Sequence, residues 1–374
     1  MITVTEVKTK KQQREFLQFP LDLYKGNPNF VPPLYADEKQ IFKKDYAYYE
    51  TSEAVYYNAY RDGQMVGRIS GILQKASNEI RKEKRVRFTR FDSINDPEVS
   101  DALFDAVEQW AIQKGMDTIC GPLGFSDLER EGLLIEGFDE LSTYEEQYNA
   151  PYYQDLIENR GYAKEVDWIE KKIFSSKDDN GKFEKTAEMA MKKYNLHIAE
   201  FKSTKELFDR YEDKLFHLLD ESYKELHGTV PITGAVRKMI VDNFKMLLTP
   251  QYINIVVNEQ DELVCFGVVL PSIAKAVQKS QGHMTPATLW RILKVRNKPE
   301  ILDLALIGVA PSYSNTGVAV VAFASLLKYL KKNHIAYMET NLELESNKNI
   351  QNIWKRFDSV QHKRRRCYVK KLTL

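Results

Sequence analysis

The segment 303–332 contains the residue types from which an anion-binding loop is built. It reads as a buried apolar stretch over 304–309, a turn at Pro311, a small polar loop and an apolar-faced helix. Backbone N–H groups in the first turn of a helix have no partner within the helix, and the helix dipole favours negative charge there. We therefore expect an anion to be bound by Val309, Ser314, Asn315, Thr316, Gly317, Val318 and Ala319.

Acidic and phenolic side chains near this loop could transfer protons. On a strand expected over 334–343, Glu339 and Glu343 fall on one face, because side chains along a strand repeat every two residues. A carboxylate in a cavity can act as a general base, so these two residues are the candidate bases. A solvated strand end is the alternative interpretation. Tyr313 is a candidate acid, although a packing tyrosine with a solvated hydroxyl would look the same.

The polar loop resembles a known motif. Residues 314–319, Ser-Asn-Thr-Gly-Val-Ala, resemble the acyl-CoA loop of the GNAT N-acetyltransferases, whose consensus is Gln/Arg-x-x-Gly-x-Gly/Ala. Gly317 and Ala319 fit this consensus, and Ser314 stands in place of Gln/Arg. The resemblance implies that the loop binds the pyrophosphate of acetyl-CoA, or of another acyl-CoA, as a co-substrate. It also implies that the acyl group passes directly to an amine, with no metal.

A second stretch extends the resemblance. Residues 347–354 are similar to the family pattern Asn-x-x-Ala-x-x-Leu-Tyr: Asn347 matches, two isoleucines keep the apolar positions, and Trp354 replaces the tyrosine. The resemblance implies that Asn347 helps to bind the acyl-CoA. In the family the phenol commonly protonates the departing thiolate, which an indole cannot do at useful pH. Either Tyr313 or Tyr368 supplies that proton, or catalysis is weak or absent.

The order of the expected elements repeats once along the chain. A hairpin, strand, helix, strand, helix and strand are expected over about 54–174 and again over about 252–372. This order resembles the GNAT core, so the expected fold class is α/β (an α+β mixed sheet) with two tandem GNAT-like folds. Two unrelated α/β domains are the alternative. We expect a degenerate N-terminal domain at 1–176, a connecting segment and helix at 177–194, and a C-terminal domain with the acyl-CoA loop at 195–374.

The N-terminal half lacks an anion loop of its own. Its counterpart, residues 92–98, contains three carboxylates and no glycine, so it would repel a pyrophosphate. We expect this half to support the fold or to form part of the acceptor pocket. The long segment 121–139 contains several apolar side chains and could be a lid, a binding surface or a cap on a sheet edge.

Composition argues against several functional classes. A length of 374 residues suggests two domains, and a net charge of +1 makes nucleic-acid binding an unexpected role. No apolar run is as long as a membrane span and the N-terminus has no apolar signal core, so we expect a cytoplasmic protein without membrane contact. The three cysteines and six histidines are dispersed, so neither disulfides nor a metal site are expected. The basic run 362–366 could meet RNA or an acidic partner, but a solvated face is the expected interpretation.

Three functions stay open at this point. The leading one is an acyl-CoA-dependent N-acyltransferase that acylates a small-molecule or peptide amine. A non-catalytic GNAT-fold binding or scaffold protein would explain the departures at Ser314 and Trp354. A third is similar to the Fem-type peptidyltransferases, which pair two GNAT-like domains and use aminoacyl-tRNA. The sequence leaves open the acceptor amine, the acyl chain length and the oligomeric state, for which a homodimer is one option.

Overall fold

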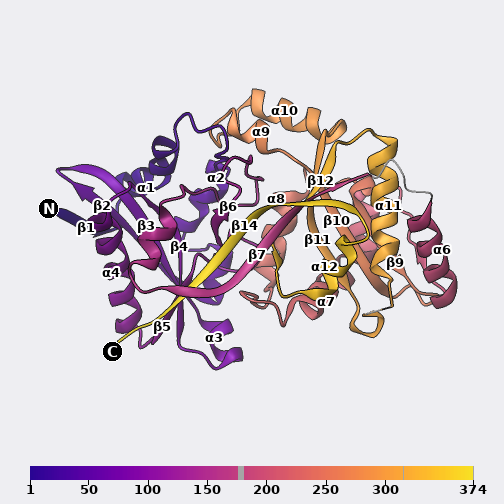
Figure 1. The fold of residues 1–374 in the computed structure, drawn as a ribbon, viewed down its shortest axis with the longest axis horizontal. Coiled ribbons are helices and arrows are strands. Elements are labelled where there is room, and N and C mark those ends of the chain that lie inside the picture. Colours follow the sequence, from indigo (N-terminus) through magenta and orange to yellow (C-terminus); the bar gives the residue numbers. More distant parts are fainter. Residues whose placement is uncertain (176–180, 315, 374) are drawn as a thin grey trace.

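The chain is built on one mixed sheet that runs through both of its halves (Figure 1). The computed structural model describes residues 1–175, 181–314 and 316–373. The strands are β1 (Ile2–Glu6), β2 (Ser52–Arg61), β3 (Gln64–Gln74), β4 (Arg85–Ser93), β5 (Thr118–Gly121), β6 (Leu133–Glu136), β7 (Ala163–Phe174), β8 (His197–Ile198), β9 (Ile253–Val257), β10 (Leu263–Pro271), β11 (Ile301–Val309), β12 (Tyr337–Thr340), β13 (Glu343–Leu344) and β14 (Asp358–Lys371). Within these residues the main path is β1-β2-β3-β4-β5-β14-β7-β12-β11-β10-β9-β8, with β13 paired to β7 and β6 paired to β14.

Helices cover both faces of this sheet, as expected for the α/β class. They are α1 (Lys10–Leu23), α2 (Tyr35–Glu38), α3 (Lys75–Arg81), α4 (Pro97–Gln113), α5 (Tyr153–Glu158), α6 (Lys182–Tyr194), α7 (Thr204–Tyr223), α8 (Gly234–Phe244), α9 (Ala274–Gln278), α10 (Pro286–Asn297), α11 (Ala319–Lys332) and α12 (Lys348–Trp354). Short 3-10 turns are η1 (Lys39–Phe42), η2 (Ala47–Glu50), η3 (Pro250–Tyr252) and η4 (Pro311–Tyr313). None of these described helices combines the length and the apolar character needed to cross a membrane.

The last strands of the two halves are exchanged. Strand β14, at the C-terminal end of the chain, pairs with β5 and β6 of the N-terminal half, and β7 pairs with β12 and β13 of the C-terminal half. The two exchanged strands also pair with each other, antiparallel, from Asp358 to Val369 of β14. In Figure 1 they cross the middle of the molecule, and the C-terminus lies beside β5. Residues 177–180 of the expected boundary lie outside the described residues, and the helix expected at 182–194 is α6.

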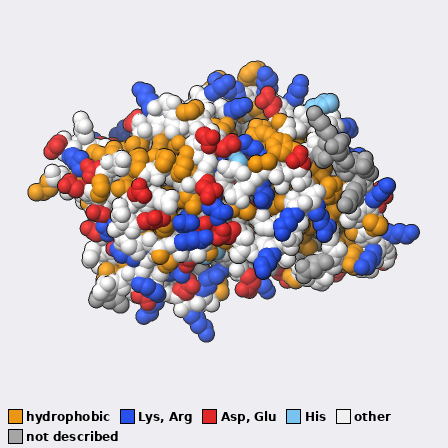
Figure 2. Space-filling view, viewed as in Figure 1, with side chains coloured by type: hydrophobic (Ala, Val, Ile, Leu, Met, Phe, Trp, Pro, Cys, Tyr) orange, Lys and Arg blue, Asp and Glu red, His pale blue; other side chains and the backbone are white. Residues whose placement is uncertain are grey.

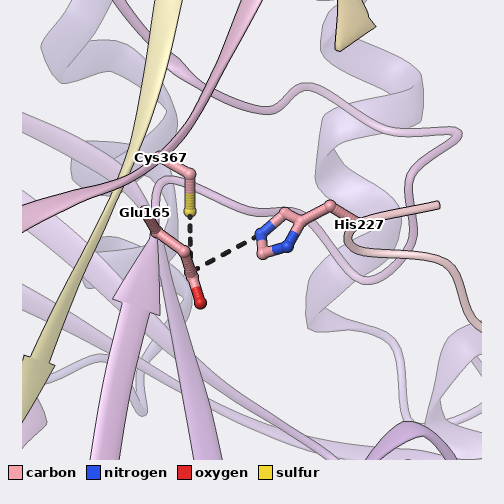
Figure 3. A group of neighbouring side chains, drawn as sticks. All are labelled: Glu165, His227 and Cys367. Atoms are coloured by element: carbon pink, nitrogen blue, oxygen red, sulfur yellow. Dashed lines mark hydrogen bonds and ion pairs between the residues drawn. The ribbon is translucent and has the colours of Figure 1, made fainter. Parts of the chain in front are cut away.

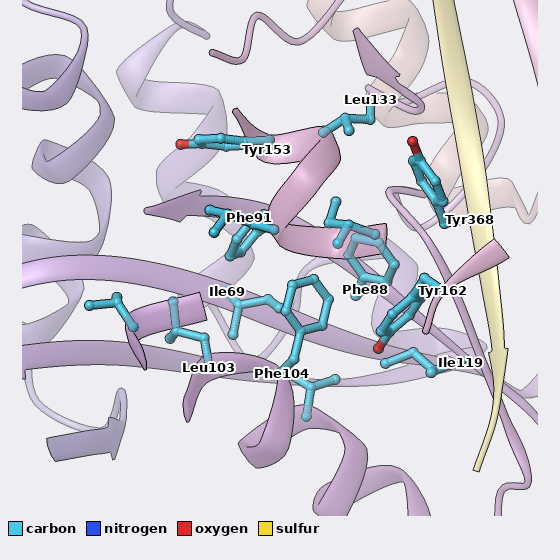
Figure 4. Packing of buried hydrophobic residues seen from close by; sticks show 14 of the residues in the cluster. Ile69, Phe88, Phe91, Leu103, Phe104, Ile119, Leu133, Tyr153, Tyr162 and Tyr368 are labelled. Carbon is cyan, nitrogen blue, oxygen red and sulfur yellow. The ribbon is translucent and has the colours of Figure 1, made fainter. Parts of the chain in front are cut away.

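The N-terminal half begins with the hairpin that its sequence predicts. Strands β2 and β3 pair across a turn in which Asp62 and Gly63 have φ angles of 50° and 78°, values that suit an Asp-Gly hairpin. Helix α4 packs on this sheet over an aromatic core (Figure 4). The ring of Phe104 lies 5.1 Å from that of Phe88 and 4.8 Å from that of Phe91, which joins α4 to β4.

In each half one pair of neighbouring strands is parallel: β4 with β5, and β11 with β12. Strand β12 pairs with β11 only as far as Leu304 and Thr340, whereas β11 continues to Val309 along β10. The two strands therefore part beyond Thr340. The continuous strand expected over 334–343 is wrong: it ends at Thr340, and β13 begins at Glu343 after a break. The period-two argument that placed Glu339 and Glu343 on one face does not hold across this break.

The basic run 362–366 lies within β14, in the middle of the sheet. The side chains of Lys363 and Arg365 are fully buried, and both pair with the buried carboxylate of Glu170 on β7, at 3.3 and 2.7 Å. The intervening Arg364 binds Asp167 at 3.1 Å. The expectation of a solvated face is therefore wrong, because the exchanged strand places these cations against acidic partners on β7. Elsewhere, acidic and basic side chains are interspersed over the face shown in Figure 2.

Candidate active site

A cavity of about 520 Å³ lies where β11 and β12 part. Residues of β11 from Leu304 to Val309 form one wall, and residues 341–344, which follow β12, form another. Helices α7 and α8 and the residues after them cover the cavity with apolar side chains: Phe208, Leu215, Phe216, Ile240, Val241, Phe244 and Leu248. The cavity is thus a largely apolar space between sheet and helices.

One end of this cavity reaches the loop that the sequence predicts to bind an anion. Gly317, with a φ of +82°, makes the left-handed turn into α11 that glycine adopts at least cost. The hydroxyl of Thr316 donates to the carbonyl of Tyr313 at 2.5 Å, which closes the loop. The predicted loop residues that line the cavity are Val309, Ser314 and Ala319; Thr316, Gly317 and Val318 lie beside them in the chain, and Asn315 is outside the described residues.

Asn347 also lines the cavity, at the start of α12. Its side chain accepts a hydrogen bond from the backbone N–H of Ile350 at 3.4 Å and so caps this helix. The residue therefore has a structural role in addition to the ligand contact that the sequence predicts, and that contact stays a prediction.

Glu343 stands in the cavity wall and is held by α12. The indole Nε1 of Trp354 donates to both carboxylate oxygens, at 2.6 and 2.8 Å, and Gln351 donates to one of them at 3.2 Å. Burial raises the pKa of Glu343 to about 8, although the hydrogen bond from Trp354 opposes that rise. A carboxyl group with this pKa exchanges its proton near neutral pH, as a general base must.

The other two candidate catalytic residues lie elsewhere. Glu339 is buried on β12, where its carboxylate is 2.5 Å from the ammonium of Lys363 and 3.3 Å from His362, both on β14. Although burial alone would raise the pKa of Glu339, the charge of Lys363 holds it below its usual value. Tyr313 packs edge-on against Tyr194 and is not among the residues that line the cavity. The structure therefore brings Glu343, but neither Glu339 nor Tyr313, to the cavity.

Two features of the cavity wall were not predicted from the sequence. A β-bulge between Val268 and Val269 leaves Ala305 of β11 without a partner in the β10 register, and Ala305 lines the cavity. Tyr223, at the end of α7, is the tyrosine among the described lining residues, and its hydroxyl accepts from the N–H of Ile307 at 3.4 Å. Burial raises the pKa of Tyr223, so the phenol is protonated at neutral pH. Neither residue lies in a recognisable motif.

The N-terminal half contributes an acidic wall. Its residues on the cavity are Asp127, Leu128, Glu129, Glu131, Glu145, Glu146 and Trp168. Together with Glu221 and Glu343 from the C-terminal half, seven carboxyl groups line the space, and none of the described lining residues is Lys or Arg. A cationic group would be attracted to this wall.

Two clusters contain side chains of the kinds that bind metals. In the first, shown in Figure 3, the Cys367 thiol and His227 Nε2 each lie 3.6 Å from one oxygen of Glu165. The guanidinium of Arg85 binds the other oxygen at 2.6 Å. In the second, the ammonium of Lys363 pairs with Glu170 and Glu339, and His362 Nε2 lies 3.3 Å from Glu339. Each cluster therefore already contains a side-chain cation, and the sequence-based expectation of no metal stays a prediction.

No protein-family model matches the chain. Over 379 residues it is 27% identical to Protein YghO of Escherichia coli strain K12, an alignment covering 97% of this chain and 94% of that protein. Over 387 residues it is 24% identical to the bacterial ceramide synthase of Caulobacter vibrioides, covering 99% of this chain and 98% of that protein.

Among solved structures, a tandem GNAT protein from the clavulanic acid biosynthesis pathway, solved without AcCoA, superposes with a TM-score of 0.58 at 10% identity. The match covers 100% of this chain and 99% of that one. A GCN5-related N-acetyltransferase from Sphaerobacter thermophilus gives a TM-score of 0.52, at 10% identity and with 100% and 96% of the two chains covered. At these identities the likeness concerns the fold, and it agrees with the loop motif and with the repeated order of elements. The chain therefore has the fold of the tandem GNAT N-acetyltransferases.

Proposed function

We propose that this protein is an acyl-CoA-dependent N-acyltransferase whose reaction takes place in the cavity between β11 and β12. The observation that carries the proposal is the cavity itself: it joins the N-terminus of α11 at one end to the carboxylate of Glu343 in its wall. A helix N-terminus suits the pyrophosphate of an acyl-CoA, and a carboxylate with a raised pKa suits a proton acceptor.

In the proposed reaction, the amine nitrogen attacks the thioester carbonyl, a C–N bond forms and the C–S bond breaks. The backbone N–H of Ala305, which the bulge leaves out of the β10 register, is the proposed group that polarises the carbonyl oxygen. Glu343 takes the proton that the nitrogen loses, and Trp354 fixes the carboxylate in place. The thiolate leaves and takes up a proton, for which Tyr223 is the phenol on the cavity wall. In this account Tyr223, rather than Tyr313 or Tyr368, replaces the tyrosine that is absent at Trp354.

The apolar walls favour long-chain substrates. An acetyl group would leave most of the space formed by α7 and α8 unfilled, whereas a fatty chain would bury apolar surface there. One similar protein is named a ceramide synthase, and a ceramide is the fatty amide of a long-chain amino alcohol. We therefore propose a fatty acyl-CoA as donor and an amine with an apolar chain as acceptor. Acetyl-CoA is the competing donor.

The test measures release of free CoA, with a thiol reagent, from palmitoyl-CoA or acetyl-CoA mixed with dodecylamine. We expect amine-dependent release, faster with palmitoyl-CoA, and detection of the fatty amide by mass spectrometry. Glu343→Gln should remove most of this activity, and Glu300→Gln, an exposed residue that does not line the cavity, should not. Absence of amine-dependent release with either thioester would support the non-catalytic alternative instead.

The aminoacyl-tRNA alternative has lost its main support, because the basic run is paired within the sheet.

A further inference from the structure

A second cavity, of about 800 Å³, lies on the N-terminal side of the first. Its walls come from the segments around α2 and η2, from β4 and from α8, whose label marks the middle of the molecule in Figure 1. The two cavities share five lining residues, so they meet along one boundary. These residues are Leu128, Glu129, Glu145, Ile240 and Phe244.

Glu145 is a partly buried acidic residue of this boundary, where the guanidinium of Arg130 acts on it through space. In the described part of the chain its carboxylate has no hydrogen bond or ion pair, whereas Glu129 accepts hydrogen bonds from Tyr46 and from the backbone of Phe125. Burial raises the pKa of Glu145 to about 7, with the guanidinium of Arg130 opposing the rise. A carboxylate in this position gains most from a cation that enters with a ligand.

Two buried carboxyl groups add negative charge to the same wall. Glu131 and Glu146 are only 5% and 3% exposed, both line the first cavity, and each has one oxygen without a hydrogen-bond partner among the described residues. Burial and the neighbouring negative charges raise the pKa of both groups. Oε2 of Glu146 lies 3.8 Å from the buried guanidinium of Arg365, whereas Oε2 of Glu131 is a buried acceptor still open to an N–H group of a ligand.

Two arginines of the second cavity are paired with carboxylates other than those of this wall. Arg90 is paired with Glu38 at 2.6 Å, and Arg68 is paired with Asp92 at 2.7 Å, in both cases away from Glu145. Arg130 donates to the carbonyl of Tyr144 at 2.7 Å. The second cavity therefore has several of its charges paired, and Arg130 and Arg365 offset part of the negative charge of Glu145 and Glu146. Carboxyl groups still outnumber cations among the described residues that line the first cavity.

We propose that the acceptor amine enters through the second cavity and that Glu145, at the boundary between the cavities, binds its ammonium group. This proposal rests on the proposed N-acyltransferase function. The ammonium group passes one proton to the carboxylate of Glu145, which leaves a neutral amine facing the thioester. The second nitrogen proton goes to Glu343 when the amide bond forms. The N-terminal half, which has no acyl-CoA loop, thus supplies the acceptor site.

The test is calorimetric titration with dodecylamine, in the absence of acyl-CoA. We expect the wild-type protein to bind it, and Glu145→Gln to weaken binding by at least about tenfold, because a buried charge pair is lost. Glu136→Gln is the matched control, since Glu136 lies in the same stretch of the chain but its side chain is 60% exposed. Ala235→Phe, which narrows the second cavity only, should also weaken binding.

Steady-state kinetics separate this proposal from the proposed function. Glu145→Gln should raise the KM for dodecylamine and leave the KM for palmitoyl-CoA unchanged. Wild-type affinity and wild-type amine KM in both Glu145→Gln and Ala235→Phe would overturn the acceptor site even if CoA is released. Conversely, tight amine binding that Glu145→Gln abolishes, without any CoA release, would support the amine site while the transferase function fails.

Discussion

Trp354 holds the carboxylate of Glu343 through its indole N–H. The indole N–H lies 2.6 and 2.8 Å from the two carboxylate oxygens, and the tryptophan side chain is 1% exposed. The departure from the family tyrosine therefore has a physical consequence: an indole cannot give up its proton, but it can position a base. In this account Trp354 is a positioning residue, and the acid is supplied elsewhere.

Replacing Glu343 should change the pH dependence of catalysis as well as its rate. The carboxyl is a base only when ionised, and its pKa is raised to about 8, so kcat of the wild-type protein should rise with pH and level off above about 8. Glu343→Gln should lower kcat by about a hundredfold to ten-thousandfold and remove this limb. A wild-type profile that is flat across this range, or an unchanged limb in the variant, would assign the base to another residue.

Trp354→Phe keeps an aromatic ring beside Phe323 and Phe357 but removes the indole N–H that donates to Glu343. We expect unfolding by urea to show a loss of about 1–3 kcal/mol, because a buried acceptor loses its partner. The pKa of Glu343 should rise further, since the hydrogen bond from Trp354 lowers it, so the pH limb should move to higher pH. The position of that limb is the readout that a purely structural tryptophan would leave unchanged.

The sequence pointed to only some of these side chains. Gly317, Asn347 and Glu343 lie in or beside a local motif. A motif of consecutive residues can be read from the sequence without knowing how distant segments pack. Tyr223 and Glu145 come from segments more than 80 residues from the loop, and single residues of this kind carry no pattern. Only the packing of α7 and of the N-terminal half against β11 brings them to the same cavity.

Helix α4 lies unusually close to β3, and a glycine makes this possible. A Cβ atom added at Gly67 would lie 2.8 Å from Leu103 Cδ1 and 3.1 Å from the carbonyl oxygen of Asp92. Gly267 of β10 faces α11 in the corresponding position of the other half, but there the nearest atom would be 3.7 Å away, an ordinary contact. The two glycines form a matched pair.

Gly67→Ala should cost about 1–3 kcal/mol of stability through overpacking, because the core around Leu103 is fully buried. Gly267→Ala should be neutral or stabilising by about 0.4–1 kcal/mol, because it restricts only the unfolded chain. Urea denaturation of both variants is the measurement. Equal effects in the two variants would mean that α4 does not approach β3 as closely as described.

Elements with local signals were predictable, and those fixed by distant partners were not. The Asp62-Gly63 hairpin and helix α6 follow from turn residues and periodicity within one stretch. The break in the strand at Asn341 depends on how β12 leaves β11, and β13 then pairs with β7. The order of elements therefore indicated the GNAT fold, but it could not give the register at the point where the cavity opens.

The exchange of β7 and β14 joins the two halves in one sheet. Each half completes its sheet with the last strand of the other, and the buried ammonium of Lys363 links β14 to Glu170 on β7 and to Glu339 on β12. In the sequence, residues 362–366 form only a basic run, and most basic runs lie on a solvent-exposed surface. The burial of Lys363 and Arg365 could not be predicted, because their shared partner Glu170 lies about two hundred residues away along the chain.

Lys363→Met should therefore destabilise the whole molecule. Removing one partner of a buried pair leaves uncompensated carboxylates, at a cost of about 3–5 kcal/mol. Lys371→Met, on the same strand but with a side chain that is 79% exposed, should cost less than about 1 kcal/mol. Urea denaturation followed by far-UV circular dichroism measures both. A small loss of stability in Lys363→Met would contradict the conclusion that the Lys363 ion pairs stabilise the junction between the two halves.

The use of acyl-CoA is the claim on which the account depends, and calorimetric titration with palmitoyl-CoA tests it most directly. Gly317 has open space around it, so Gly317→Ala should strain the backbone without filling the loop, while Gly317→Glu adds a negative charge where the phosphates are expected. We predict saturable binding by the wild-type protein, retained in Gly317→Ala and abolished in Gly317→Glu. No binding by the wild-type protein, or equal binding by Gly317→Glu, would contradict it.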